Sequence, residues 1–337
     1  MIKTVILLSF LFLGNAISAQ KLSSTDLKAL RKKEDSLKTL SLNIIQGRTA
    51  GDRFLADSQF TKIFVRALKI KNSFYYPFDS LITISKLSPP DSAFKIFTWQ
   101  MVINDNVVRQ HGAIQMRTAD GSLKLFPLID KSDVISNMAD TIGNNFGWVG
   151  AVYYKIIETQ ASGRKYYTLL GYDENNIRSN KKLVEVLTFD NGQPIFGGDY
   201  FTYTQTNPAE QFGKRLILEF KKRASPRLVY DSDQNMIIFE HLVPEEGGDA
   251  KKRYTYVGDG DYEGLKWKDG KWIHINKVFT LTTKEGEEPV PNPIRDANGN
   301  IDQTKLKDKG FAGTEDEEKP AKIKVTPSKI KVKKNNN

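Results

Sequence analysis

The chain of 337 residues is long enough for one large domain or two small ones, and 39% hydrophobic with 11% aromatic residues can supply a core. It contains no cysteine, which excludes disulfides, thiol nucleophiles and thiolate metal sites. The formal net charge of +10 would suit an anionic partner. However, seven lysines and no acid lie between Lys319 and Lys334, so most of the excess charge belongs to one terminal segment.

Residues 1–19 have the pattern of a secretory signal peptide. Lys3 supplies the positive charge, Val5 to Leu13 form a short apolar run, and small residues precede Ala19. Cleavage after Ala19 would leave Gln20 as the new N-terminus. A retained membrane anchor is the alternative, but a span takes roughly 20 apolar residues. The pattern therefore predicts export to the periplasm, the cell surface or the medium.

Residues 20–90 are expected to form a helical N-terminal segment. Ser24 or Thr25 can cap a first helix, and the residues from Gln46 to Gly51 break it. A second helix is expected from about Asp52 to Ile70, because apolar residues recur there at helical spacing. Both segments carry an ordinary mixture of charges, which is typical of helices that pack on a core.

Residues 91–284 are expected to form an antiparallel β domain. Apolar runs of six to ten residues recur from about Phe94, and turn signals such as Asn191-Gly192 separate them. About ten to twelve strands are expected, with one helical interruption at Ser132 to Asp140. The fold class is α+β, with two helices packed on a β-meander that forms a sandwich or a curved half-barrel; an incomplete propeller stays open.

Residues 285–337 are rich in Pro, Gly, Asn and charge, which predicts a disordered tail. An acidic run from Glu315 to Glu318 precedes the lysines. A solvated tail is the simpler interpretation, and electrostatic contact of the Lys-rich part with an anionic surface is the alternative. No nucleic-acid partner is expected, because no arginine cluster interleaved with aromatic residues accompanies the lysines.

Several short segments resemble a group of uncharacterised exported proteins of the Bacteroidota. The resemblance covers most of residues 72–272. It is carried by residues 72–81, 94–99, 167–172, 194–197 and 262–265, which read NSFYYPFDSL, FKIFTW, YTLLGY, PIFG and YEGL. It implies a periplasmic or surface location. It implies no reaction, since the group has no established activity.

A catalytic site has one weak candidate. The chain has three histidines, and His111 stands out because Arg109, two residues earlier on the same expected strand, would share its face. The alternative is a structural histidine within a strand. No G-x-S-x-G or H-E-x-x-H motif is present.

Metal and ligand sites also have weak candidates. Asp259, Asp261 and Glu263 alternate along one segment and could present oxygens to calcium, or they could form a solvated turn. No other cofactor is expected. Trp267 and Trp272 flank an expected hairpin at residues 268–271. They could stack on sugar rings, or they could pair across the hairpin and stabilise the sheet.

These observations favour a non-catalytic binding or scaffolding module of the cell envelope, with an envelope protein or a glycan as partner. The alternative is a secreted hydrolase that acts on glycan or peptide. A cleft with paired carboxylates, or His111 beside an acid and a hydroxyl, would favour the hydrolase. A contiguous exposed apolar patch would favour the binding module.

Overall fold

The computed structural model describes residues 22–279 apart from residues 105, 204–209, 246 and 250. Contacts divide the chain into two units at Phe279, and every described residue belongs to the first unit. The expected signal peptide and the expected tail therefore lie outside the described residues.

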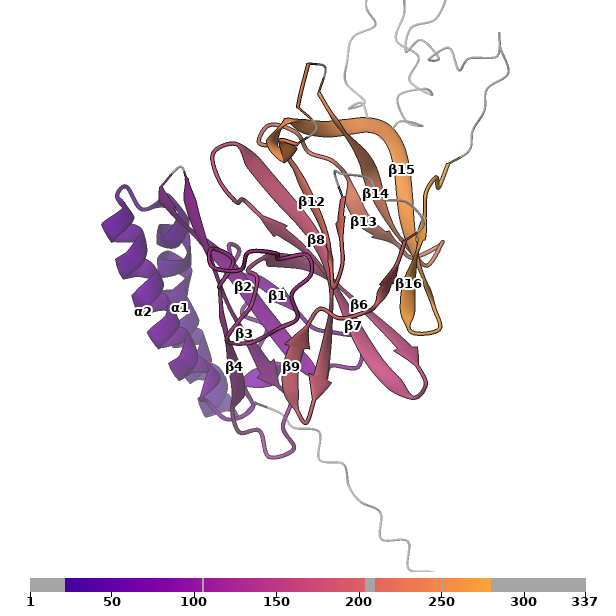
Figure 1. The fold of residues 1–337 in the computed structure, drawn as a ribbon. Coiled ribbons are helices and arrows are strands. Elements are labelled where there is room, and N and C mark those ends of the chain that lie inside the picture. Colours follow the sequence, from indigo (N-terminus) through magenta and orange to yellow (C-terminus); the bar gives the residue numbers. More distant parts are fainter. Residues whose placement is uncertain (1–21, 105, 204–209, 246, 250, 280–337) are drawn as a thin grey trace, which may run out of the picture. The chain divides into compact units, whose positions relative to one another are not determined.

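Two antiparallel helices open the described chain (Figure 1). Helix α1 spans Ser24–Gln46 and α2 spans Ala50–Leu68. The cap of α1 is Ser23, not Ser24 or Thr25, because the Ser23 side chain accepts a hydrogen bond from the backbone N–H of Asp26. Helix α2 begins with a reciprocal capping box between Thr49 and Asp52.

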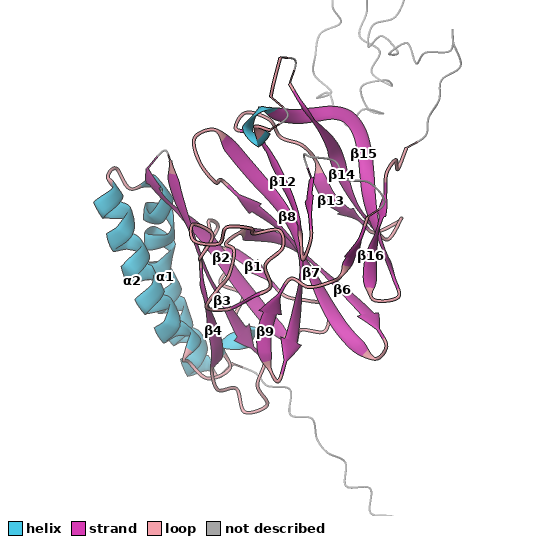
Figure 2. Cartoon of the chain, viewed as in Figure 1, coloured by secondary structure: helices cyan, strands magenta, loops and turns pink. Residues whose placement is uncertain are grey.

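Sixteen strands follow in the described residues, and they form three sheets (Figure 2). The first sheet contains, in order, β1 (Ser85–Leu87), β2 (Phe94–Asn104), β3 (Val107–Met116) and β4 (Lys124–Ile129). The second contains β11 (Glu210–Phe212), β12 (Leu216–Lys221), β8 (Ser179–Asp190), β7 (Arg164–Asp173) and β6 (Val152–Ala161), with β9 (Gln193–Phe196) on β8 and β5 (Gly143–Asn144) on β9. The third contains β10 (Phe201–Thr202), β16 (Lys271–Ile275), β15 (Tyr256–Lys268), β14 (Met236–Pro244) and β13 (Leu228–Asp231).

The expected α+β class is confirmed: two helices precede a set of mostly antiparallel strands. The exception among the paired strands is β10, which runs parallel to β16. The hairpin expected at Asn191-Gly192 joins β8 to β9, and both residues adopt the positive φ that such a tight turn requires. The predicted helix at residues 132–140 is wrong. Turns lie there instead, and the Met138 carbonyl is bonded to a distant arginine side chain.

The helices and sheets stack as layers with an apolar core between each pair. Phe60 and Phe64 of α2 pack on Trp99 and Phe97 of β2, with ring centroids 5.2 and 5.0 Å apart. A second core joins the first sheet to the second, and a third core joins the second sheet to the third. The second sheet therefore contributes to a core on each face, and the adjacent Leu169 and Leu170 of β7 belong to the two different cores.

A buried ion pair lies in the core between the first and second sheets. The Arg215 Nε atom donates to Glu185 at 2.9 Å, and neither side chain has exposed surface. The Tyr153 hydroxyl also donates to Glu185 and accepts from Trp148 Nε1 at 2.7 Å. The arginine binds the carbonyls of Met138, Thr141 and Phe196 with its remaining nitrogens. We call the side chains of Arg215, Glu185, Tyr153 and Trp148 the Arg215 network.

Candidate functional site

The structure pairs His111 with an acid. His111 lies on β3, and its Nδ1 atom is 2.9 Å from Oδ1 of Asp57 on α2. Asp57 is buried and also accepts a hydrogen bond from Trp99 Nε1 at 2.8 Å. Because the carboxylate holds the proton on Nδ1, Nε2 of a neutral His111 would be the acceptor.

The His111–Asp57 pair has the arrangement of a general base. A third of the His111 side chain is exposed (33%), and within the described residues Nε2 makes no hydrogen bond. In the described part of the chain His111 forms no hydrogen bond with a hydroxyl group, so none of its hydrogen bonds positions a nucleophile. Arg109, expected on the same face, forms an ion pair with Asp133 at 2.8 Å.

The other two histidines contact the predicted calcium ligands on β15. His241 Nδ1 is 2.8 Å from Asp259, and His274 Nε2 is 2.6 Å from the buried Glu263. Asp261 faces Lys277 at 3.3 Å. Burial alone would raise the pKa of Asp259, but hydrogen bonds from His241 and from the Asp261 backbone lower it. Within the described residues no group of three or more His, Asp or Glu side chains is arranged to hold a metal ion. Calcium binding at this segment stays a prediction.

The tryptophans form the cross-strand pair of the expected hairpin. Trp267 and Trp272 lie opposite each other on β15 and β16, with ring centroids 5.4 Å apart. Trp272 has no exposed surface and donates to Thr168 Oγ1 at 2.8 Å. Trp267 is half-buried. A sugar-binding role for either residue stays a prediction.

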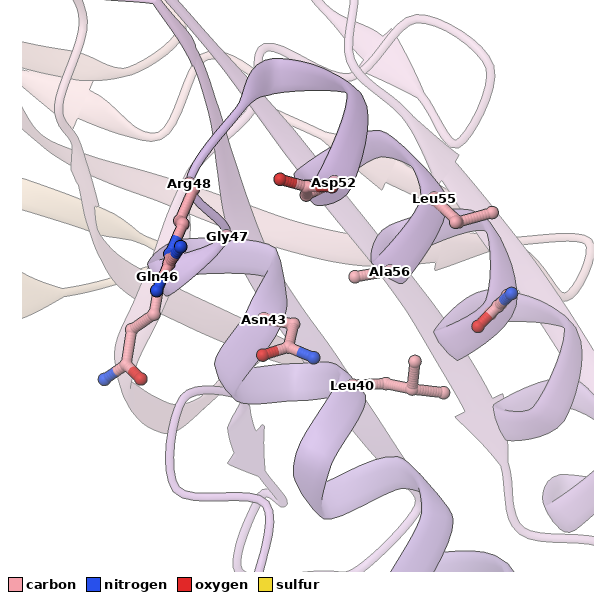
Figure 3. A pocket seen from close by; sticks show the side chains of 9 residues that line it. Leu40, Asn43, Gln46, Gly47, Arg48, Asp52, Leu55 and Ala56 are labelled. Carbon is pink, nitrogen blue, oxygen red and sulfur yellow. The ribbon is translucent and has the colours of Figure 1, made fainter.

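A groove of about 400 Å³ lies between the end of α1 and the start of α2. Figure 3 shows its side chains, which come from both helices and from the turn between them. Its apolar wall consists of Leu40, Leu55 and Ala56, and 60% of Leu55 is exposed. Its polar wall consists of Asn43, Gln46, Arg48, Asp52 and Gln59. This volume lies within the range of small-ligand and peptide pockets.

Exposed apolar side chains gather near this groove. Ile45 at the end of α1 and Phe54 at the start of α2 are 41% and 48% exposed. A second hollow lies near Tyr75 and Tyr76. The Glu34 carboxylate in it already accepts hydrogen bonds from the Tyr76 and Ser80 hydroxyls, so it is less available to a ligand. The α1–α2 groove is therefore the better candidate for recognition.

Comparison with family models, curated proteins and solved structures gives no match for this chain. No helix in the described residues is both long and apolar enough to cross a bilayer.

Sequence reasoning missed Asp57 and the groove. Asp57 precedes Phe60 by three residues and Phe64 by seven, so helical spacing places it on the apolar face of α2. A carboxylate on an apolar face was a signal that a partner was needed there. The groove left no comparable signal, because exposed leucines are common on helices.

Proposed function

We propose that this chain is an exported, non-catalytic binding module of the cell envelope, and that the α1–α2 groove holds a peptide segment of a partner envelope protein. The observation that carries the proposal is the apolar wall of the groove, where Leu55 is 60% exposed next to exposed Phe54. Such a rimmed apolar surface is typical of an interaction site. Export rests on the pattern of residues 1–19.

The charges around the groove favour an acidic peptide. Residues 22–71 contain eleven Lys and Arg against five Asp and Glu. Within the groove, the Asp52 carboxylate is occupied by the Thr49 backbone and hydroxyl at 3.0 and 2.9 Å. Arg48 is exposed and has no partner in the described chain, so it can bind a carboxylate of the peptide.

The uncharged polar groups suit an extended backbone. Asn43, Gln46 and Gln59 are exposed, and each carries both a donor and an acceptor. Carboxamides of this kind can bond the N–H and C=O groups of a peptide, while Leu40 and Leu55 contact an apolar side chain. The partner class is therefore an acidic segment with an apolar anchor.

The test uses a photocrosslinking amino acid at Leu55 in the mature chain, incubated with envelopes of the source cell. The matched control places it at Ile82, which is apolar, 77% exposed and outside the groove. A discrete, protease-sensitive adduct from position 55 alone, lost in Arg48→Glu and kept in Ile82→Glu, is the expected result. Equal adducts from both positions would overturn the groove as the site. An adduct sensitive to glycosidase and resistant to protease would overturn the peptide.

A hydrolase is a second candidate, because His111 has the acid partner that a general base needs. The mature chain would be tested on peptide and glycan substrates, with His111→Ala compared against His241→Ala. Turnover that is lost only in His111→Ala would support hydrolysis. No turnover, or equal turnover in both variants, would remove the candidate.

A further inference from the structure

A second polar cluster lies between the first and second sheets, on the face of the first sheet that points away from the helices. Gln100 on β2 and Gln110 on β3 are direct cross-strand partners. Their neighbour Trp99 packs under the helices, so the alternation of a strand turns the glutamines toward the second sheet. Gln110 is 1% exposed.

The amide nitrogens of both glutamines are committed to carboxylates. Gln100 Nε2 donates to Glu174 at 2.9 Å, and Gln110 Nε2 donates to Asp173 at 3.0 Å. Lys222 neutralises Glu174 at 3.3 Å. The same oxygen of Asp173 also accepts from the Asn175 backbone at 2.9 Å. These hydrogen bonds orient each carboxamide with its nitrogen toward an acid.

The amide oxygens of both glutamines are buried and have no partner in the described chain. An unpaired buried acceptor is unfavourable, because it has lost its hydrogen bonds to water without gaining a replacement. Because Gln100 and Gln110 are cross-strand partners, their side chains lie next to each other on this face of the sheet. Each unpaired oxygen calls for a donor or a cation in this part of the core.

A further carboxylate adjoins this place. Asp130 accepts from the Gln110 backbone N–H at 3.0 Å and from the Ser132 backbone N–H at 2.9 Å. Burial raises the pKa of Asp173, the charge of Asp130 raises it further, and Lys181 on the adjacent strand opposes the shift. Asp130 and Asp173 are therefore close enough for their charges to interact, and Lys181 partly offsets them.

We propose that Gln100, Gln110, Asp130 and Asp173, the glutamine cluster, bind a hard divalent cation, with Ca²⁺ as the best fit. The two unpaired groups are amide oxygens with carboxylates nearby, and Ca²⁺ accepts carboxylates and side-chain carbonyls in flexible geometry. Mg²⁺ requires near-ideal octahedral geometry and keeps its waters, so two carboxamides on adjacent strands suit it less well. This site is separate from the calcium site predicted at Asp259, Asp261 and Glu263 on β15.

The test is calorimetric titration of the chelator-treated mature chain with CaCl₂, with MgCl₂ at equal ionic strength as comparison. One saturable Ca²⁺ site is expected, with at least about a tenfold loss of affinity in Asp173→Asn and in Gln110→Met. Asp190→Asn, at the exposed end of β8, is the matched control and should bind Ca²⁺ like the parent. Circular dichroism of each variant reports folding, and Gln100→Met, which alters a less buried side chain, serves if Gln110→Met does not fold.

Two results would overturn the proposal. No heat and no change in Tm with Ca²⁺ would mean that ordered water satisfies the two oxygens. Binding that is lost in Asp261→Asn and kept in Asp173→Asn would place the ion on β15. Neither result would affect the crosslinking test of the α1–α2 groove.

Discussion

The core between the first and second sheets contains two polar clusters that differ in one respect. In the Arg215 network every buried side-chain nitrogen and oxygen has a hydrogen-bond partner in the described chain. In the glutamine cluster two buried oxygens have none. Both clusters carry charge, so charge alone does not distinguish them.

The difference separates a structural role from a binding role. A buried ion pair with complete hydrogen bonding can be fully explained by what it holds together, here the 138–141 segment and the second sheet. A buried cluster with unpaired acceptors is explained only when a donor, a water or a cation is added.

Arg215→Met should be the most damaging change. It leaves the Glu185 carboxylate buried without its cation and removes the donors to the Met138 and Thr141 carbonyls. A loss of about 3–5 kcal/mol in the free energy of unfolding is expected from chemical denaturation. The double variant with Glu185→Gln should recover part of the loss. A loss below about 1 kcal/mol, within the scatter of surface changes, would contradict a structural role.

Asp173→Asn should have an intermediate effect that depends on pH. Burial and Asp130 raise the pKa of Asp173 in the folded chain above the ordinary value of 3.8. The contribution of Asp173 to stability is therefore full below that value and is lost as pH rises through the raised pKa. In the presence of chelator, the asparagine variant should gain stability relative to the parent over this window. If the free energy of unfolding changed with pH in the same way for both proteins, ionisation of Asp173 would not destabilise the folded chain.

Lys222→Met should have the smallest effect. Its ion pair with Glu174 resembles Arg215 with Glu185 in chemistry, but the two side chains are 32% and 31% exposed. The loss in unfolding free energy should be under about 1 kcal/mol and should shrink in high salt. A cost as large as that of Arg215→Met would show that burial does not determine how much an ion pair of this chain contributes to stability.

Local features of the fold could be predicted from the sequence. The stripe of Phe60 and Phe64 fixed the buried face of α2, and Asn191-Gly192 marked a real hairpin. Trp267 and Trp272 were predicted as a possible cross-strand pair, and they are one. Each of these signals depends on residues close together in the chain, where helical or strand geometry determines the neighbours.

The candidate sites could not be predicted in the same way. Asp57 and His111 are 54 residues apart, and Gln110 and Asp173 are 63 apart, so their contacts depend on how separate layers stack. A glutamine in a strand is also expected to face solvent. Here the helices cover one face of the first sheet and the second sheet covers the other. Spacing along the chain carries no information on which sheets meet.

The stacking order of the layers has a consequence for how the chain acquires its structure. The helices, the first sheet, most of the second sheet and most of the third follow one another along the sequence. A chain that emerges N-terminus first can complete one layer before the next arrives, and each finished apolar face is a template for the following strands. We therefore expect assembly to proceed outward from α1 and α2, with the third sheet as the last part to become protected from hydrogen exchange.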